Sequence, residues 1–194
     1  MIARWRDVWR RFSGRGAYPH ELAFVLTLPL RRFLQPPEAL VARLALAPDA
    51  RVLELGPGPG WFSPHVARAL PRGKLVLYDL QREMLAKARR RLNRAGVANA
   101  AFVQGDGARL PFRDASFDVA FLVAVLGEVP DPAACVAELR RVLRAGGLLA
   151  LTETRCDPDA LSRDDLVALA QPRGFALECV DLERAAFTAR FRAQ

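Results

Sequence analysis

The chain has 194 residues, 52% of them hydrophobic and 26% charged, a length that suits one globular domain with a full buried core. No apolar run approaches the roughly 20 residues that span a bilayer, no secretory signal opens the chain, and three widely spaced cysteines support neither a disulfide framework nor a zinc site. We therefore expect a cytoplasmic protein. The net charge of +8 suggests nucleic acid or an anionic membrane as partners, but nearly all of it is arginine, which a GC-rich coding bias also produces.

The first 35 residues are predicted to form a basic amphipathic arm, separate from a domain over residues 36–194. Ile2, Trp5, Trp9 and Phe12 fall on one stripe of a helix, with arginines at the positions between them. Such a helix can lie on a membrane surface, with residues 1–26 in contact. The alternative, which we favour, is a lid that folds over the site formed by the rest of the chain.

A glycine run in the first third of the chain is its most informative feature. Residues 52–55 are predicted to be a buried strand, and Gly56, Gly58 and Gly60 follow at alternate positions. Glycine-rich turns between a strand and a helix let the backbone approach a ligand closely. Asp79 lies after a second apolar run, at the spacing of a carboxylate that binds a ribose diol. The pattern predicts a site for a nucleoside-type cofactor.

The spacing of these glycines argues against a dinucleotide. A dinucleotide site reads G-x-G-x-x-G, whereas this run reads G-x-G-x-G and has Trp61 where the third glycine is wanted. Glu54 adds a negative charge beside the loop, which would repel a pyrophosphate but attract an ammonium or sulfonium group. The sequence therefore favours a cofactor with a positive charge.

Strands and helices alternate along the rest of the chain, which predicts a parallel sheet. Helices are predicted over residues 36–46 and 61–70, from residues 81–85 onward, from 131 to a stop at Gly146-Gly147, and from 162 to about 171. Strands are predicted over residues 52–55, 75–78, 100–103, from 116–119 onward, and over 148–152, 175–182 and 186–191. The arginines of the helix after Asp79 are interpreted as a solvated face rather than a phosphate track.

From about residue 49 to residue 154, these segments resemble the class I S-adenosylmethionine-dependent methyltransferases. The run E-x-G-x-G-x-G at residues 54–60 is similar to the family's motif I. Residues 103–112 resemble the end of its third strand, and residues 140–149 resemble its R-x-L-x-P-G-G segment. Within the class the chain looks like the type 11 group of small-molecule enzymes related to quinone biosynthesis. The resemblance implies an α/β fold: a Rossmann-like, seven-stranded, mostly parallel sheet with helices on both faces and an antiparallel C-terminal hairpin.

The resemblance also implies which residues bind S-adenosylmethionine and its product S-adenosylhomocysteine. Asp79 would bind both ribose hydroxyls, with Leu80 packed on the adenine. Asp106 would bind the adenine amino group, with the Gly107 amide on a ring nitrogen. The implied cofactor-binding residues are Glu54, Gly56, Pro57, Gly58, Gly60, Asp79, Leu80, Asp106, Gly107, Leu122 and Val123. For Asp79 and Asp106 the alternative is a helix or turn cap.

Residues for methyl transfer itself are less clearly marked. Many relatives carry a histidine pair after the fourth strand, where this chain has Gly127 and Glu128. Glu128 is therefore a candidate base or cofactor contact, or a residue that holds the loop. Glu128 and Glu153, which lies at the end of the fifth strand, are candidate acceptor contacts, as are Tyr18 and His20 if the arm is a lid. No metal is expected.

The predicted acceptor is a small, lipophilic molecule, because the type 11 group includes enzymes for lipids, quinones and secondary metabolites. Two alternatives stay open. The basic charge would suit an RNA or protein methyltransferase, although no N-P-P-[YF] motif of amino-methylating enzymes follows the fourth strand. The missing histidines would suit a partner protein that binds S-adenosylmethionine without transferring its methyl group. The sequence does not determine the oligomeric state.

Overall fold

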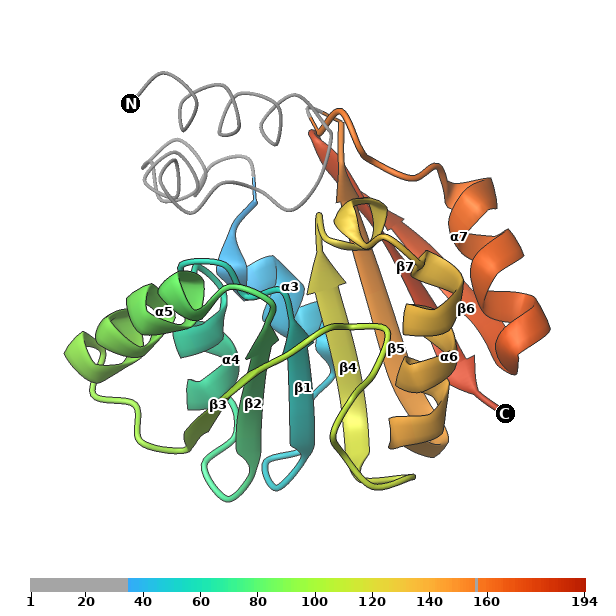
Figure 1. The fold of residues 1–194 in the computed structure, drawn as a ribbon. Coiled ribbons are helices and arrows are strands. Elements are labelled where there is room, and N and C mark those ends of the chain that lie inside the picture. Colours follow the sequence, from blue (N-terminus) through green and yellow to red (C-terminus); the bar gives the residue numbers. More distant parts are fainter. Residues whose placement is uncertain (1–34, 156) are drawn as a thin grey trace, which may run out of the picture.

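The computed structural model describes residues 35–155 and 157–194, which form a seven-stranded sheet with helices on both faces (Figure 1). The strands are β1 (Arg51–Leu55), β2 (Lys74–Asp79), β3 (Ala100–Gln104), β4 (Phe117–Val123), β5 (Leu143–Thr154), β6 (Phe175–Leu182) and β7 (Ala186–Ala193). Their order is β3-β2-β1-β4-β5-β7-β6, and neighbours run parallel except that β7 is antiparallel to β5 and β6. This confirms the predicted sheet and its C-terminal hairpin. The predicted arm, apart from Gln35, lies outside the described residues, and so do Tyr18 and His20.

The helices divide the apolar core into two layers. On one face lie α3 (Pro37–Leu44), α4 (Ser63–Arg68) and α5 (Arg82–Arg94), and on the other lie α6 (Pro132–Val142) and α7 (Arg163–Ala170) (Figure 1). Successive side chains of a strand point to opposite faces, so in β1 Val52 packs toward α3–α5 while Leu53 and Leu55 pack toward α6 and α7. The same alternation places Glu54 on the face of Val52. Among the described residues, no helix is long and apolar enough to cross a membrane.

The helices predicted to begin at residues 131 and 162 are both capped by side chains at these positions. The Asp131 side chain accepts a hydrogen bond from Ala134 N at 2.9 Å, and Pro132 occupies the first position of α6. At α7, Ser162 and Asp165 form a reciprocal capping box. Short 3-10 turns, η3 (Leu126–Glu128) and η4 (Gln171–Arg173), precede α6 and follow α7.

Two predicted boundaries were wrong. The helix expected over residues 61–70 covers only Ser63–Arg68, because the chain is still in the glycine loop before Ser63. The pair Gly146-Gly147 does not end α6, which stops at Val142. β5 begins directly afterwards, and the glycines lie where the β4–β5 pairing is irregular, with Gly146 at φ +71°. A bulge of this kind needs a residue that tolerates positive φ, which glycine supplies.

Candidate cofactor site

The glycine loop runs from the end of β1 to the start of α4, at the edge of the sheet where ligands bind in open α/β folds. Gly56, Gly58 and Gly60 all have positive φ, between +54° and +75°. A Cβ on Gly56 would lie 2.5 Å from Cγ2 of Val125, and one on Gly60 would lie 2.9 Å from Cα of Ala88. These two glycines are therefore required by packing within the protein, whatever ligand the loop holds.

Asp79 connects two backbone segments at this edge. Its Oδ2 accepts a hydrogen bond from Gly58 N at 3.2 Å, and its Oδ1 accepts one from Gln81 N at 2.8 Å. Burial raises its pKa to about 6, and the two backbone hydrogen bonds act in the opposite direction. Since a carboxylate has about four acceptor sites, both oxygens keep the capacity to bind a diol. The next residue, Leu80, is apolar and 55% exposed.

Glu54 is a buried carboxyl group beside the loop, with only 3% of its surface exposed. Its Oε2 has no hydrogen-bond partner among the described residues, and neither has Oγ of Ser63 at the start of α4. Burial raises the pKa of Glu54 to about 8; the Ser63 hydroxyl, close enough to interact with the carboxyl group, lowers it, and the Asp79 charge raises it further. A buried carboxyl group with one oxygen lacking a partner is costly when it is charged, so this position fits a ligand that brings a positive charge.

The remaining motif I residue, Pro57, is buried, and its carbonyl accepts a hydrogen bond from Gly60 N at 3.0 Å. It contributes to the shape of the turn. Gly56 N donates to the Tyr78 carbonyl at 2.8 Å, which ties the loop to the end of β2. The loop, β2 and Asp79 thus form one hydrogen-bonded unit.

Asp106 and Gly107 lie in the connection after β3. The exposed Asp106 side chain accepts a hydrogen bond from Ala108 N at 3.0 Å, which is the turn geometry named as its alternative role. This bond engages Oδ1 and leaves Oδ2 with no hydrogen bond to the described residues. At Gly107, a Cβ would come within 3.3 Å of the Cys135 Sγ atom in α6.

The two predicted residues of β4 do not share one surface. Leu122 is 2% exposed and belongs to the core beside α6 and α7. Val123 is half-buried and packs against the opposite layer. Consecutive strand residues point to opposite faces, which separates them.

The acidic residues predicted for the acceptor side lie near one another. Glu153, at the end of β5, is 2% exposed. Burial raises its pKa to about 8, and the Asp157 and Glu128 charges raise it further, while a hydrogen bond from the Leu161 backbone lowers it. Glu128 ends η3 and is half-buried. The described residues contain no group of three or more His, Cys, Asp or Glu that could hold a metal ion.

Sequence reasoning missed several residues that shape the site. Val125 and Ala88 limit the space at the glycine loop, and Ser63 lies beside Glu54. Tyr78 and Arg141 hold the connection that carries Asp106. Of these residues, only Ser63 could have been identified from the sequence, because it is the first polar residue after the glycine run. The others act through contacts between distant segments, which no local pattern reveals.

Comparisons with known proteins agree with this geometry. A family model described as a methyltransferase domain matches residues 53–151. The chain is 34% identical, over 171 residues, to an uncharacterized 37.1 kDa protein in transposon TN4556 of Streptomyces fradiae, covering 86% of this chain and 49% of that protein. It is 38% identical, over 130 residues, to a demethylmenaquinone methyltransferase of Parafrankia sp., covering 59% of this chain and 50% of that protein. The chain thus spans about half the length of these curated relatives.

The fold also has a counterpart among solved structures. A SAM-dependent methyltransferase from Aquifex aeolicus superimposes with a TM-score of 0.86, covering 92% of this chain and 100% of that chain. The two sequences are 21% identical, so this likeness shows the fold alone.

Proposed function

The chain belongs to the class I S-adenosylmethionine-dependent methyltransferases, in the type 11 group, and on that premise we propose that it transfers a methyl group from S-adenosylmethionine to a small, lipophilic acceptor. The cofactor supplies an electrophilic methyl group on a sulfonium centre. The residues of the chain bind and orient it and exclude water from the reacting groups.

The observation that carries the proposal is the buried carboxyl group of Glu54, whose Oε2 has no hydrogen-bond partner among the described residues. A buried carboxyl with an unpartnered Oε2 favours a ligand that carries an ammonium or sulfonium group. A pyrophosphate at the same loop would place negative charge beside Glu54 and Asp79. Glu54 thus supports S-adenosylmethionine over a dinucleotide.

The rest of the cofactor fits the neighbouring residues. Asp79, held by two backbone hydrogen bonds, would bind the ribose hydroxyls. Leu80 offers an exposed apolar side chain to the adenine, and the free Oδ2 of Asp106 is available to its amino group. Gly58 and Gly60 would line the methionine part, with Val123 at the end of β4.

The acceptor side supports a neutral, apolar substrate. Glu153 is nearly fully buried, and its raised pKa keeps the carboxyl group protonated near neutral pH. A neutral carboxyl can donate a hydrogen bond to an acceptor without burying an unpaired charge. Glu128, closer to solvent, is the candidate base. The demethylmenaquinone methyltransferase among the relatives is named for a quinone, which is consistent with this acceptor class.

The charge distribution weakens the RNA alternative. Seven of the 29 Lys and Arg residues, but only two of the 21 Asp and Glu residues, belong to residues 1–34. Residues 35–194 therefore carry 22 basic and 19 acidic side chains, which is close to balance. The excess of positive charge, which suggested a nucleic acid as partner, therefore lies mainly outside the domain that would hold the cofactor.

Calorimetry with S-adenosylmethionine, S-adenosylhomocysteine and NAD tests the cofactor. We expect binding of the first two, and Asp79→Asn to weaken it by about 1.5–3 kcal/mol, as for hydrogen bonds to a charged group. Asp118→Asn is the matched control, because Asp118 accepts a backbone hydrogen bond from Arg51 at the opposite end of the sheet. Preference for NAD, or equal effects of the two variants, would contradict the proposal.

Transfer of a labelled methyl group tests the acceptor. The full chain would be incubated with labelled S-adenosylmethionine and either a demethylmenaquinol or bulk tRNA. We expect label in the organic phase with the quinol and none in tRNA. Label in tRNA alone would identify an RNA methyltransferase, and cofactor binding without transfer to a wide acceptor panel would favour a non-catalytic partner protein.

A further inference from the structure

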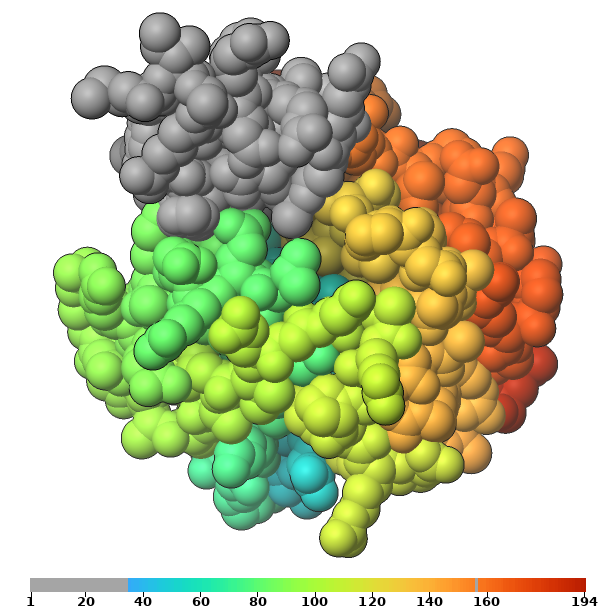
Figure 2. Space-filling model, in the orientation of Figure 1, coloured from blue at the N-terminus to red at the C-terminus, as the bar shows by residue number. Residues whose placement is uncertain are grey.

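The connection between β3 and β4, residues 105–116, contains neither helix nor strand, and it carries Asp106 and Gly107. In Figure 2 it crosses the visible surface, in yellow-green, between α5 and α6. An irregular segment of this kind loses substantial conformational entropy when it becomes ordered. Its conformation must therefore be held by contacts from the rest of the fold.

The first of these contacts comes from Tyr78, next to Asp79 in β2. Its side chain lies in the core layer beside α6. The hydroxyl lies 3.0 Å from the Asp106 carbonyl and 3.2 Å from the Arg109 carbonyl, and donates toward both. A Cβ at residue 105 would overlap this hydroxyl, so Gly105 is required there. Tyr78 thus fixes both ends of the turn that contains Asp106.

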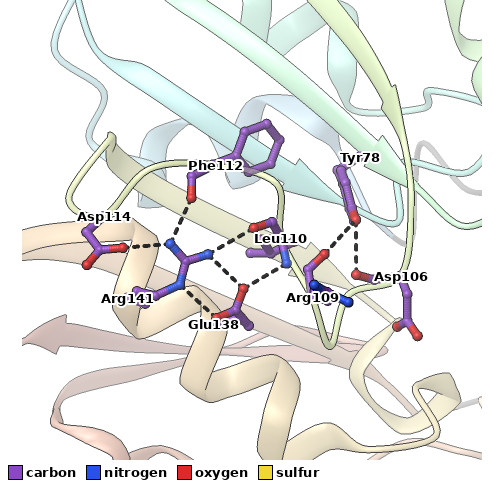
Figure 3. Close-up of polar contacts among 8 residues, drawn as sticks. All are labelled: Tyr78, Asp106, Arg109, Leu110, Phe112, Asp114, Glu138 and Arg141. Carbon is purple, nitrogen blue, oxygen red and sulfur yellow. Dashed lines mark hydrogen bonds and ion pairs between the residues drawn. The ribbon is translucent and has the colours of Figure 1, made fainter.

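The second contact comes from the Arg141 guanidinium on α6 (Figure 3). It donates to the carbonyls of Leu110 and Phe112, at 2.9 and 2.7 Å, and to the Asp114 carboxylate at 2.7 Å. Two further hydrogen bonds of 2.7 Å join it to Glu138. Glu138 in turn accepts from Leu110 N at 2.8 Å. One side chain therefore holds three points of the connection.

The side chains of Arg141 and Glu138 are both charged under ordinary conditions. The Arg141 guanidinium holds the pKa of Glu138 below its usual value, and the Leu110 amide acts in the same direction, against partial burial. All three guanidinium nitrogens are engaged, in a planar fork that a lysine ammonium cannot reproduce. Phe112 connects the contacts of Arg141 and Tyr78. Its carbonyl accepts from Arg141, and its ring packs edge-to-face on Tyr78 with ring centroids 5.7 Å apart.

We propose that three side chains act as positioning residues: Tyr78 of β2 and Glu138 and Arg141 of α6. They hold residues 105–112 in the conformation that binds the adenine, and this conformation lets the chain distinguish adenine from other bases. The inference rests on the proposed function. Arg141 contacts backbone beyond Asp106, and Tyr78 contacts the backbone of Asp106 itself. Both act through the connection, whose ordering before binding reduces the entropy lost on binding.

Base discrimination is the readout that separates positioning from general stability. S-inosylhomocysteine has a carbonyl where S-adenosylhomocysteine has the amino group, so a correctly placed Asp106 should disfavour it. In Arg141→Lys and Tyr78→Phe, we expect the Kd for S-adenosylhomocysteine to rise by about three- to thirtyfold, the range for residues that act through others. The Kd for S-inosylhomocysteine divided by the Kd for S-adenosylhomocysteine should fall toward one in both variants.

Matched controls account for loss of stability. Arg192→Lys alters an arginine that is bound to Glu178 at 2.8 Å on the distant hairpin. Thr188→Val removes a buried hydroxyl that lies 2.9 Å from Thr152. Both variants should keep the wild-type ratio even if their Tm falls. In an Asp106→Ala background, Arg141→Lys should change affinity little further, because the carboxylate that it positions is gone.

The outcomes are distinct. A wild-type chain that binds neither nucleoside overturns the proposed function and this inference with it. Wild-type binding with an unchanged ratio in both Arg141→Lys and Tyr78→Phe overturns the inference alone. Additive effects of Arg141→Lys and Asp106→Ala on affinity would also overturn it, since they would assign Arg141 a role independent of the connection.

Discussion

Glu54 and Asp79 lie at the carboxyl ends of neighbouring strands, and burial raises the pKa of both, to about 8 and about 6. Asp79 is stabilised by two backbone amides, whereas Glu54 has an oxygen without a partner among the described residues. Such a carboxyl lowers the stability of the free protein. A cationic ligand would recover that loss on binding, which connects stability and cofactor affinity to pH.

The first prediction concerns stability of the free protein. A carboxyl group with a raised pKa keeps its proton longer in the folded state, so stability falls as pH rises from the unfolded pKa, 4.5, through the folded pKa of about 8. We expect the Tm to decrease between about pH 5 and pH 9. Glu54→Gln should flatten this dependence, and adding Glu153→Gln should flatten it further, because both groups contribute.

Thermal unfolding across this pH range measures the effect, with Glu83→Gln on the exposed face of α5 as the control. The control should keep the wild-type slope. If the Tm of Glu54→Gln falls with pH as steeply as that of the wild type, Glu54 is not responsible for the pH dependence of stability.

The second prediction concerns the cofactor. A positive charge beside Glu54 lowers its pKa, so binding of S-adenosylmethionine should release a proton near neutral pH and tighten from about pH 6 to pH 8.5. S-adenosylhomocysteine keeps the ammonium group but lacks the sulfonium, so equal pH dependence for the two ligands would place the ammonium beside Glu54, and a weaker dependence for S-adenosylhomocysteine would place the sulfonium there. Calorimetry in two buffers of different ionisation enthalpy counts the protons. Absence of proton release with both ligands, or no change in Glu54→Gln, would count against an electrostatic role.

At the scale of elements, close packing decides where the glycine loop can lie. The loop passes between α5 and the segment after β4, where Gly60 faces Ala88 and Gly56 faces Val125. The sequence showed a glycine-rich turn and its ligand class, but it did not show that two of its glycines are required by helix packing. The reason is that the contact partners are distant in the sequence.

A pair of substitutions separates packing from backbone strain. Gly60→Ala would combine a positive φ of +75° with a Cβ 2.9 Å from the Ala88 backbone, and we expect it to destabilise the fold by about 2–5 kcal/mol. Gly96→Ala has a similar φ, +68°, but nothing within 4 Å of its Cβ, and should cost about 1–2 kcal/mol. Urea unfolding measures both. Equal costs would show that the loop can move away from α5.

At the scale of the molecule, the two ends of the described chain meet beside the sheet. Arg43 at the end of α3 contacts Glu183 in the β6–β7 turn at 2.6 Å, with both side chains largely buried. Arg190 of β7 donates to the Arg43 carbonyl at 3.1 Å. These contacts fix the C-terminal hairpin to the helix that precedes β1.

Removal of one partner tests this connection. Glu183→Gln leaves Arg43 partly buried without its counter-charge, and we expect a loss of about 1–3 kcal/mol in the free energy of unfolding. Glu178→Gln, at the more exposed pair with Arg192, should cost less than about 1 kcal/mol. Chemical denaturation of the two variants compares them directly. A larger loss of stability for Glu178→Gln than for Glu183→Gln would contradict the prediction that the more buried pair contributes more.

The alternation of strands and helices and a nucleoside-type cofactor were predictable from short-range patterns, namely apolar periodicity and the spacing of Glu54, the glycines and Asp79. The family and the seven-stranded fold were predictable from the resemblance of the segments between about residues 49 and 154 to one class of enzyme. The tertiary structure was needed to show that Glu54 is buried with an oxygen lacking a partner, that Leu122 belongs to the core, and that Tyr78 and Arg141 hold the connection that carries Asp106. Burial, pKa and long-range hydrogen bonds depend on segments that the fold brings together, so no local pattern encodes them.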